Sequence, residues 1–200
     1  IKYIVIHYTG NDGDSDEGNA NYFKNIRNAS AHYFVDDDSI TQSVHDNYTA
    51  WSVGGNKYPS CEESGGGKWY GKCTNTNSIS IELCDSVKNG VYDFTENTLK
   101  QAAELTKELM SKYNIPLENV IRHFDVTGKV CPQPFVRDNR KWEAFKNRLK
   151  INDDPELFKA VRKIILSGIN LNINSWKRID LMKITNVPSL LDKLGGIDSL

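Results

Sequence analysis

The chain has 200 residues, of which 25 are Lys or Arg and 26 are Asp or Glu, so its formal net charge is −1. This balance argues against nucleic acid as the main partner, because nucleic-acid binding calls for a clustered basic surface. Hydrophobic residues make up 38% and charged residues 26%, which is typical of a folded protein and not of a disordered one. No stretch approaches the roughly 20 apolar residues of a membrane helix, so no membrane partner is expected.

Short strands and helices are predicted along the first three quarters of the chain. In chain order they are a strand over 2–7, a helix over 16–28, a hairpin of 31–35 and 39–44, a glycine-rich loop over 52–77, a strand over 78–84, a helix over 96–113, a strand over 120–123 and a helix over 138–149. The strand over 78–84 alternates apolar and polar residues, which predicts one core face and one polar face. In 96–113 apolar residues recur at spacings of three and four, which is typical of an amphipathic helix.

The composition changes near residues 152–155, and the chain beyond is expected to be helical throughout. About 50 residues are too few to bury much core of their own. We therefore expect two parts, a main domain over 1–150 and a small all-helical module over 151–200.

Two histidines and one cysteine have the setting of metal ligands. His7 closes the first strand, His123 stands at the end of a later strand, and Cys131 follows in the adjoining loop. Residues at strand ends and in a neighbouring loop can converge on one ion, and two imidazoles with one thiolate form a three-ligand zinc site with an open position. An open position suits hydrolysis, since zinc lowers the pKa of a water molecule towards 7. By itself this pattern leaves open an ordinary structural or surface role for each histidine.

Five motifs in order carry a resemblance to a known family: IVIHYTG, SAHYFV, AWSVGG, NSISIEL and RHFDVTGKVCP. Together they resemble the zinc-dependent N-acetylmuramoyl-L-alanine amidases, the superfamily that includes the peptidoglycan recognition proteins, over roughly residues 1–149. The resemblance implies an α/β fold with a central mixed sheet flanked by helices and a zinc cleft at one side. It also implies hydrolysis of the amide between muramic acid and the first L-alanine of bacterial peptidoglycan, with Zn²⁺ held by His7, His123 and Cys131.

Two further residues match catalytic positions of that family. Glu82 matches the acidic residue assigned as general base in one branch, and Lys129 matches a basic residue that stabilises the oxyanion. The chemistry of the residues agrees with these roles: a partly desolvated carboxylate near the metal can take a proton from water and return it to the leaving amine, and an ammonium group can hold developing negative charge. Without the motif, an exposed strand carboxylate and a solvated loop lysine would be the simpler interpretations.

Three residues are candidates for the substrate cleft. His32 matches a frequent His-aromatic pair of the family and lies either at the cleft or in the core, Trp51 borders a sugar site or packs, and Asp125 either orients His123 or caps a turn. Ser52 stands where many members of the family have a histidine. Cys61 and Cys73, at the two ends of the long loop, are either a disulfide or two free thiols.

The C-terminal segment resembles a helical module of several Gram-positive phage and prophage amidases, where it is thought to bind cell wall. The expected protein is thus a phage or prophage endolysin or an autolysin, which is held in the host cytoplasm before release or is secreted, and which acts at the cell wall. A non-catalytic peptidoglycan-recognition module is the alternative, although such modules commonly lack the zinc cysteine. A structural zinc protein is a third interpretation, but no convincing fourth ligand is evident.

Overall fold

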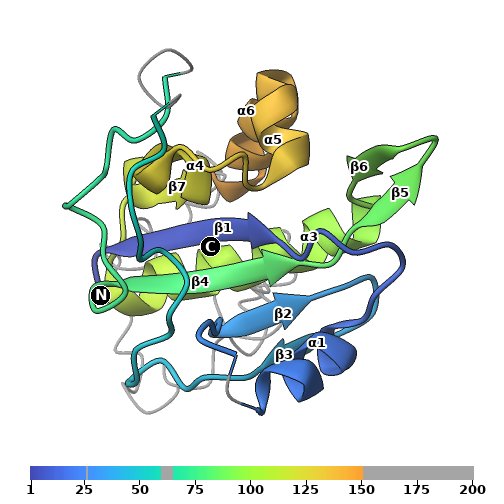
Figure 1. Ribbon diagram of the computed structural model, residues 1–200, viewed down its shortest axis with the longest axis horizontal. Coiled ribbons are helices and arrows are strands. Elements are labelled where there is room, and N and C mark those ends of the chain that lie inside the picture. Colours follow the sequence, from blue (N-terminus) through green and yellow to red (C-terminus); the bar gives the residue numbers. More distant parts are fainter. Residues whose placement is uncertain (26, 60–64, 151–200) are drawn as a thin grey trace, which may run out of the picture. The chain divides into compact units, whose positions relative to one another are not determined.

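A five-stranded mixed sheet with the order β3-β2-β4-β1-β7 forms the centre of the computed structural model (Figure 1), which describes residues 1–25, 27–59 and 65–150. Its strands are β1 (Tyr3–Tyr8), β2 (Tyr33–Val35), β3 (Ile40–Gln42), β4 (Ser78–Leu83) and β7 (Val120–Arg122). All neighbouring pairs are parallel except β2 and β3, which form the predicted antiparallel hairpin. The predicted mixed sheet is therefore confirmed, whereas the predicted helical module over 151–200 lies outside the described residues.

Helices cover the sheet and flank its edges. They are α1 (Asp16–Phe23), α3 (Glu96–Tyr113), α4 (His123–Thr127), α5 (Gln133–Arg137), α6 (Asn139–Leu149) and the short 3₁₀ helix η1 (Leu117–Asn119), and a separate hairpin is formed by β5 (Ser86–Lys88) and β6 (Val91–Asp93). In Figure 1, α3 runs behind the sheet, α1 flanks the β3 edge and α4 to α6 gather beyond β7. Within the described residues, no helix combines the length and the apolar character that crossing a bilayer requires.

The main hydrophobic core lies between the sheet and α3. Alternate residues of β1 and β4 are fully buried there, such as Ile4, Ile6, Ile79 and Ile81. They belong to one hydrophobic cluster with apolar residues of α3 and α6. Burial of this apolar face is the dominant stabilising contribution to such a fold. Helix α3 has the bounds expected from its periodicity, beginning with a Thr95 cap, which accepts a hydrogen bond from the Thr98 backbone.

The opposite face of β4 carries polar residues but is also covered. Ser78 and Ser80 on β4 are buried, because segments of the long loop pack over them: the Ser78 hydroxyl donates to the Thr74 carbonyl at 2.7 Å, and the Ser80 hydroxyl contacts that of Ser52. The predicted polar face of β4 is therefore present, but it is buried inside the protein. A parallel strand in the middle of a sheet is normally buried on both sides, and this arrangement overrides the alternation.

Other elements also differ from the predictions. Helix α1 ends at Phe23 instead of residue 28, where Asn28 has a positive φ of 56° that an α-helix cannot continue through. The strand expected over 120–123 ends at Arg122, and His123 already begins α4. The hairpin of β5 and β6 has no counterpart among the predicted elements.

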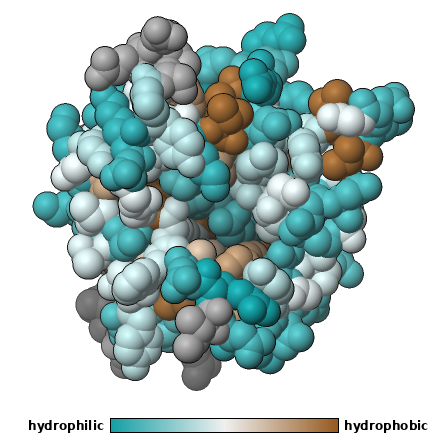
Figure 2. Space-filling model, in the orientation of Figure 1, coloured by the Kyte–Doolittle hydropathy of each residue, from teal (hydrophilic) through white to brown (hydrophobic). Residues whose placement is uncertain are grey.

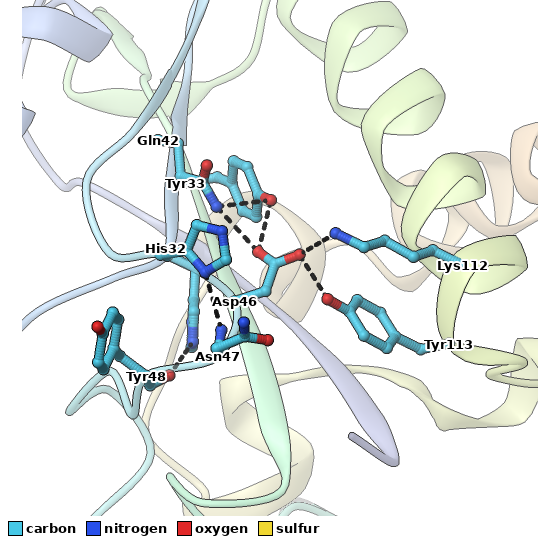
Figure 3. Close-up of polar contacts among 9 residues, drawn as sticks. His32, Tyr33, Gln42, Asp46, Asn47, Tyr48, Lys112 and Tyr113 are labelled. Carbon is cyan, nitrogen blue, oxygen red and sulfur yellow. Dashed lines mark hydrogen bonds and ion pairs between the residues drawn. The ribbon is translucent and has the colours of Figure 1, made fainter.

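A buried carboxylate joins the loop after β3 to helix α3 (Figure 3). Asp46 accepts hydrogen bonds from the Tyr33 hydroxyl (2.6 Å), the Gln42 amide (3.0 Å), the Lys112 ammonium (2.7 Å) and the Tyr113 hydroxyl (2.7 Å). Burial by itself would raise the pKa of Asp46, but the hydrogen bonds from Lys112 and the two tyrosines outweigh it and lower the pKa to about 2. The loop that begins here leads to Trp51, so the network fixes a segment that reaches the candidate site.

Replacing Asp46 with asparagine is expected to lower the free energy of unfolding at pH 7 by about 2–3 kcal/mol. The four donors now share two carboxylate oxygens, whereas asparagine would offer them one oxygen and an NH₂ group that is itself a donor. The pKa of Asp46 is lower in the folded state than in the unfolded chain. Its contribution is therefore complete above about pH 4 and is lost as the pH falls through about 2. Urea unfolding of both proteins between pH 7 and pH 2 checks this, and a difference that stays constant down to pH 2 would contradict it.

Candidate functional site

The fold brings the three predicted metal ligands together at the carboxyl ends of the parallel strands. His7 lies near the end of β1, His123 begins α4 directly after β7, and Cys131 lies in the loop between α4 and α5. One ligand atom from each lies within 4.8 Å of the others, and all three side chains are buried. Strands β1 and β7 are parallel neighbours, so the two histidines meet at the same edge, with ring centroids 4.7 Å apart.

Cys131 returns to the histidines because the loop before it is held against α4. Helix α4 ends at Thr127 and is capped by Gly128, whose φ of 82° belongs to the left-handed region that favours glycine. The Phe124 backbone N–H then donates to the Cys131 carbonyl at 2.8 Å. This turn leaves the Cys131 sulfur 3.8 Å from His7 Nδ1.

The state of the two imidazoles suits a metal ion. His7 Nε2 and His123 Nδ1 are buried and have no hydrogen-bond partner, which is costly unless another group binds them. Burial, with repulsion from His123 and Lys129, lowers the pKa of His7 well below its usual value, and burial with the charge of Lys129 lowers the pKa of His123 to about 4. Both rings are therefore neutral at pH 7, the form that binds metals. These three residues could hold a metal ion.

Glu82 lies beside this group on the next strand. The register of β1 and β4 pairs it with His7, and its Oε1 is 3.8 Å from His7 Nδ1. Burial raises the pKa of Glu82 to about 8; the Lys129 ammonium opposes this rise, whereas Asp14 and Asp85 add to it. Its Oε2 is buried without a partner, so this carboxyl group has an oxygen free to exchange a proton.

A cleft of about 610 Å³ joins these residues to their surroundings. Its lining includes the five predicted metal-site and catalytic residues, namely His7, Glu82, His123, Lys129 and Cys131, and also Trp51. The cleft opens on the side of the sheet opposite α3, since His7 and Glu82 lie on the strand face that does not contact it. Figure 2 views the molecule from that side and shows mainly hydrophilic side chains, with hydrophobic ones in a few patches.

His32, for which the sequence left both a cleft and a core role open, does not line this cleft. It is 1% exposed, the Ser80 backbone N–H donates to its Nδ1 at 3.0 Å, and its Nε2 donates to the Tyr48 carbonyl at 3.1 Å. Both ring nitrogens are thus used inside the protein. Of the two positions that the sequence allowed for His32, the structure therefore shows the one in the core.

Asp125 is also absent from the lining of the cleft. Its carboxylate accepts from the Arg122 backbone N–H at 2.8 Å and pairs with the Arg122 guanidinium at 2.8 Å, which caps the start of α4. His123 Nδ1 has no hydrogen-bond partner, so Asp125 does not bind it there. Asp125 stabilises the helix that carries His123 and does not orient the imidazole directly.

The long loop over 52–77 reaches the cleft through Ser52, although part of this loop lies outside the described residues. Cys73 is a free, buried thiol, and Cys61, its possible disulfide partner, is outside the described part. Residues that sequence reasoning missed include Thr9, Asn11, Asn19 and Tyr22, all of which line the cleft. Asn19 and Tyr22 stand three apart on α1, but nothing in this spacing showed that their side of the helix faces a cleft.

Comparisons with known proteins agree with this architecture. The family model described as N-acetylmuramoyl-L-alanine amidase matches residues 1–134. A probable N-acetylmuramoyl-L-alanine amidase of Bacillus licheniformis is 32% identical over 154 residues, which cover 74% of this chain and 41% of the relative. The chain thus spans about two fifths of the length of that curated relative.

Solved structures give the same result. The structure of PlyL is 33% identical, with a TM-score of 0.59, and the match covers 76% of this chain and 85% of that one. The catalytic domain of XlyA is also 33% identical, with a TM-score of 0.55, over 74% of this chain and 84% of that one. By its sequence, its fold and the match over residues 1–134, this chain belongs to the N-acetylmuramoyl-L-alanine amidase family.

Proposed function

We propose that this chain is a zinc-dependent amidase that hydrolyses the bond between N-acetylmuramic acid and L-alanine in bacterial peptidoglycan. The observation that carries the proposal is the group of His7, His123 and Cys131 beside Glu82 in one cleft. A recognition module needs neither these ligands nor a carboxyl group with a raised pKa, so the site favours catalysis. The names of the relatives, which are N-acetylmuramoyl-L-alanine amidases, support the substrate.

Zinc fits the donor set best. Two imidazole nitrogens and one thiolate are ligands that Zn²⁺ prefers, and three protein ligands leave a fourth position free, as in other hydrolytic sites. When bound, zinc acts as a Lewis acid that polarises the scissile carbonyl and promotes the ionisation of water. His7 and His123 bind as neutral rings, and Cys131 binds after losing its proton.

The other residues of the site move protons and balance charge. Glu82 accepts the proton of the attacking water and delivers it to the nitrogen of the leaving L-alanine, which allows the amide bond to break. Lys129 is exposed in the loop before Cys131, and its charge already acts on Glu82 and both histidines. The same charge stabilises the oxyanion that forms on the carbonyl oxygen of the lactyl group.

The biological setting of this proposal is the bacterial cell wall. We propose that the enzyme acts there as an endolysin or autolysin, either after release from a host cytoplasm or after secretion. Residues 1–150 form one compact unit, which we assign to catalysis, and the remaining 50 residues would form a separate wall-binding module.

Product analysis on purified Gram-positive peptidoglycan tests the proposal. New amino groups on L-alanine should appear without new reducing sugar ends, and a chelator should abolish them until zinc is restored. Reducing ends would indicate a glycosidase instead. Binding to the wall by zinc-loaded protein without any new ends would leave a recognition module.

A further inference from the structure

The cleft has two chemically different ends. The metal end contains the ligand group with Glu82 and Lys129, which are the charged residues among the described ones that line the cleft. The other end is aromatic and is lined by Tyr22, Phe23, Phe34 and Trp51. We call this second group the aromatic end.

Strand register sets the distance between the two ends. Phe34 on β2 pairs with Glu82 on β4, which in turn pairs with His7 on β1. Neighbouring strands lie about 4.8 Å apart, so the backbone of Phe34 is separated from that of His7 by roughly 10 Å. When the scissile bond of a substrate lies at the metal group, the part of the substrate next to that bond can therefore reach the aromatic end.

Trp51 is an exposed aromatic residue on a firmly held backbone. Its side chain is 64% exposed although it borders the cleft. Its backbone N–H donates to the Ser30 hydroxyl at 2.9 Å, and its carbonyl accepts from the Ser30 N–H at 3.0 Å. The following Ser52 N–H donates to the Asn75 side chain at 3.1 Å. These hydrogen bonds hold the backbone that carries the Trp51 indole in place before a ligand binds, which lowers the entropic cost of binding.

Tyr22 is placed in a similar way. It is 55% exposed, its ring lies edge-on to Phe23 with centroids 5.1 Å apart, and the Arg27 guanidinium covers it at 4.2 Å. Phe23 in turn stacks on the buried Phe34 at 5.5 Å. This aromatic series connects an exposed ring to the core and holds it at the edge of the cleft.

We infer that Trp51 and Tyr22 form a saccharide subsite that binds the muramoyl sugar of the substrate. This inference rests on the proposed function, in which the sugar and the stem peptide extend in opposite directions from the scissile amide. A pyranose ring presents flat C–H faces that pack on aromatic rings without needing a charge. The stem peptide carries carboxylates, and none of the four side chains that line the aromatic end has a charge to pair with them; Arg27, which covers Tyr22, does not line the cleft. The sugar therefore occupies the aromatic end, and the peptide leaves the metal group in another direction.

Two substrates with the same scissile amide test this subsite in the full chain. One is N-acetylmuramoyl-L-alanyl-D-isoglutamine, and the other is D-lactoyl-L-alanyl-D-isoglutamine, which lacks the sugar. Trp51→Ala and Tyr22→Ala should each lower kcat/KM for the muramoyl substrate by about tenfold and change it by less than about twofold for the lactoyl substrate. Trp51→Phe should recover part of the loss. An equal loss on both substrates would mean a structural role and would overturn the subsite.

Tyr48→Ala is the matched control. Tyr48 belongs to the same loop and is 72% exposed, but it does not line the cleft, and its ring points away from the Asp46 network in Figure 3. Its loss should leave both substrates unaffected. If the unmodified chain releases no amino groups of L-alanine from peptidoglycan, the proposed function has failed. If it releases them but Trp51→Ala and Tyr22→Ala keep full kcat/KM on the muramoyl substrate, only the saccharide subsite has failed.

Binding gives an answer when the lactoyl substrate reacts too slowly to measure. The indole N–H signal of Trp51, identified by its absence from the spectrum of Trp51→Phe, should shift on titration with N-acetylmuramic acid. It should stay in place with L-alanyl-D-isoglutamine. The reverse result would assign the aromatic end to the peptide and overturn the inference.

Discussion

Replacing Cys131 with serine is expected to remove both metal binding and peptidoglycan hydrolysis. The Cys131 sulfur lies 3.8 Å from His7 Nδ1 and is buried, so in the proposed zinc site it would supply the third ligand after losing its proton. A hydroxyl is a far poorer ligand for zinc than a thiolate, and two buried imidazoles would remain. Zinc content after dialysis should fall from about one ion per chain towards zero, and amidase activity should fall by a factor of about 10³ or more.

Cys84→Ser is the matched control for this experiment. Cys84 is also buried, but its sulfur accepts a hydrogen bond from Asn19 and does not belong to the ligand group. This variant should keep its zinc and most of its activity. Full activity of Cys131→Ser without zinc would contradict the metal mechanism, whereas the loss of zinc from both variants would point to a general loss of structure.

Replacing Glu82 with glutamine is expected to abolish most of the activity while leaving the metal in place. Glutamine has nearly the same size and can occupy the same position next to His7, but it cannot take a proton from water. General acid–base catalysis contributes about 10²–10⁴ to the rate, so kcat should fall by a factor in that range. Zinc content and the unfolding midpoint should change little, and Lys129 should still act on the oxyanion.

Glu104→Gln provides the comparison. Glu104 is exposed on α3, across the sheet from the cleft, so its neutralisation should change kcat by less than about twofold. In the unmodified chain Glu82 must be ionised to act as a base, so kcat/KM should fall as the pH drops below the pKa of Glu82. Near-normal activity of Glu82→Gln would rule out this role, and a loss of zinc would identify Glu82 as a ligand.

Local patterns predicted the elements that depend on short stretches of chain. The apolar spacing in 96–113 gave α3 its correct bounds, and the β-branched run at the start predicted β1. The motif around His7, His123 and Cys131 predicted that these residues meet, and the structure brings them within 4.8 Å. Sequence patterns can succeed here because the two histidines stand at the ends of neighbouring strands that a parallel sheet aligns, and Cys131 follows a short distance along the chain.

The environment of other residues depends on parts of the chain that are distant in sequence. The sequence was compatible with either a cleft or a core position for His32. Its place in the core depends on the Ser80 backbone N–H, 48 residues away, which donates a hydrogen bond to the imidazole. Asp46 drew no attention in the sequence, because its partners Lys112 and Tyr113 are more than 60 residues away. The burial of Ser78 and Ser80 likewise depends on a loop that packs over them.

By itself the sequence determined the family, the order of the main elements and the group of residues at the metal end. Only the tertiary structure decided which other side chains face the cleft, including Tyr22 at its aromatic end. The reason is physical: periodicity reports which residues share a face of one element, but the burial of that face depends on what packs against it. Helix α1 shows this clearly, since Asn19 and Ala20 are buried while Tyr22 is left exposed at the cleft.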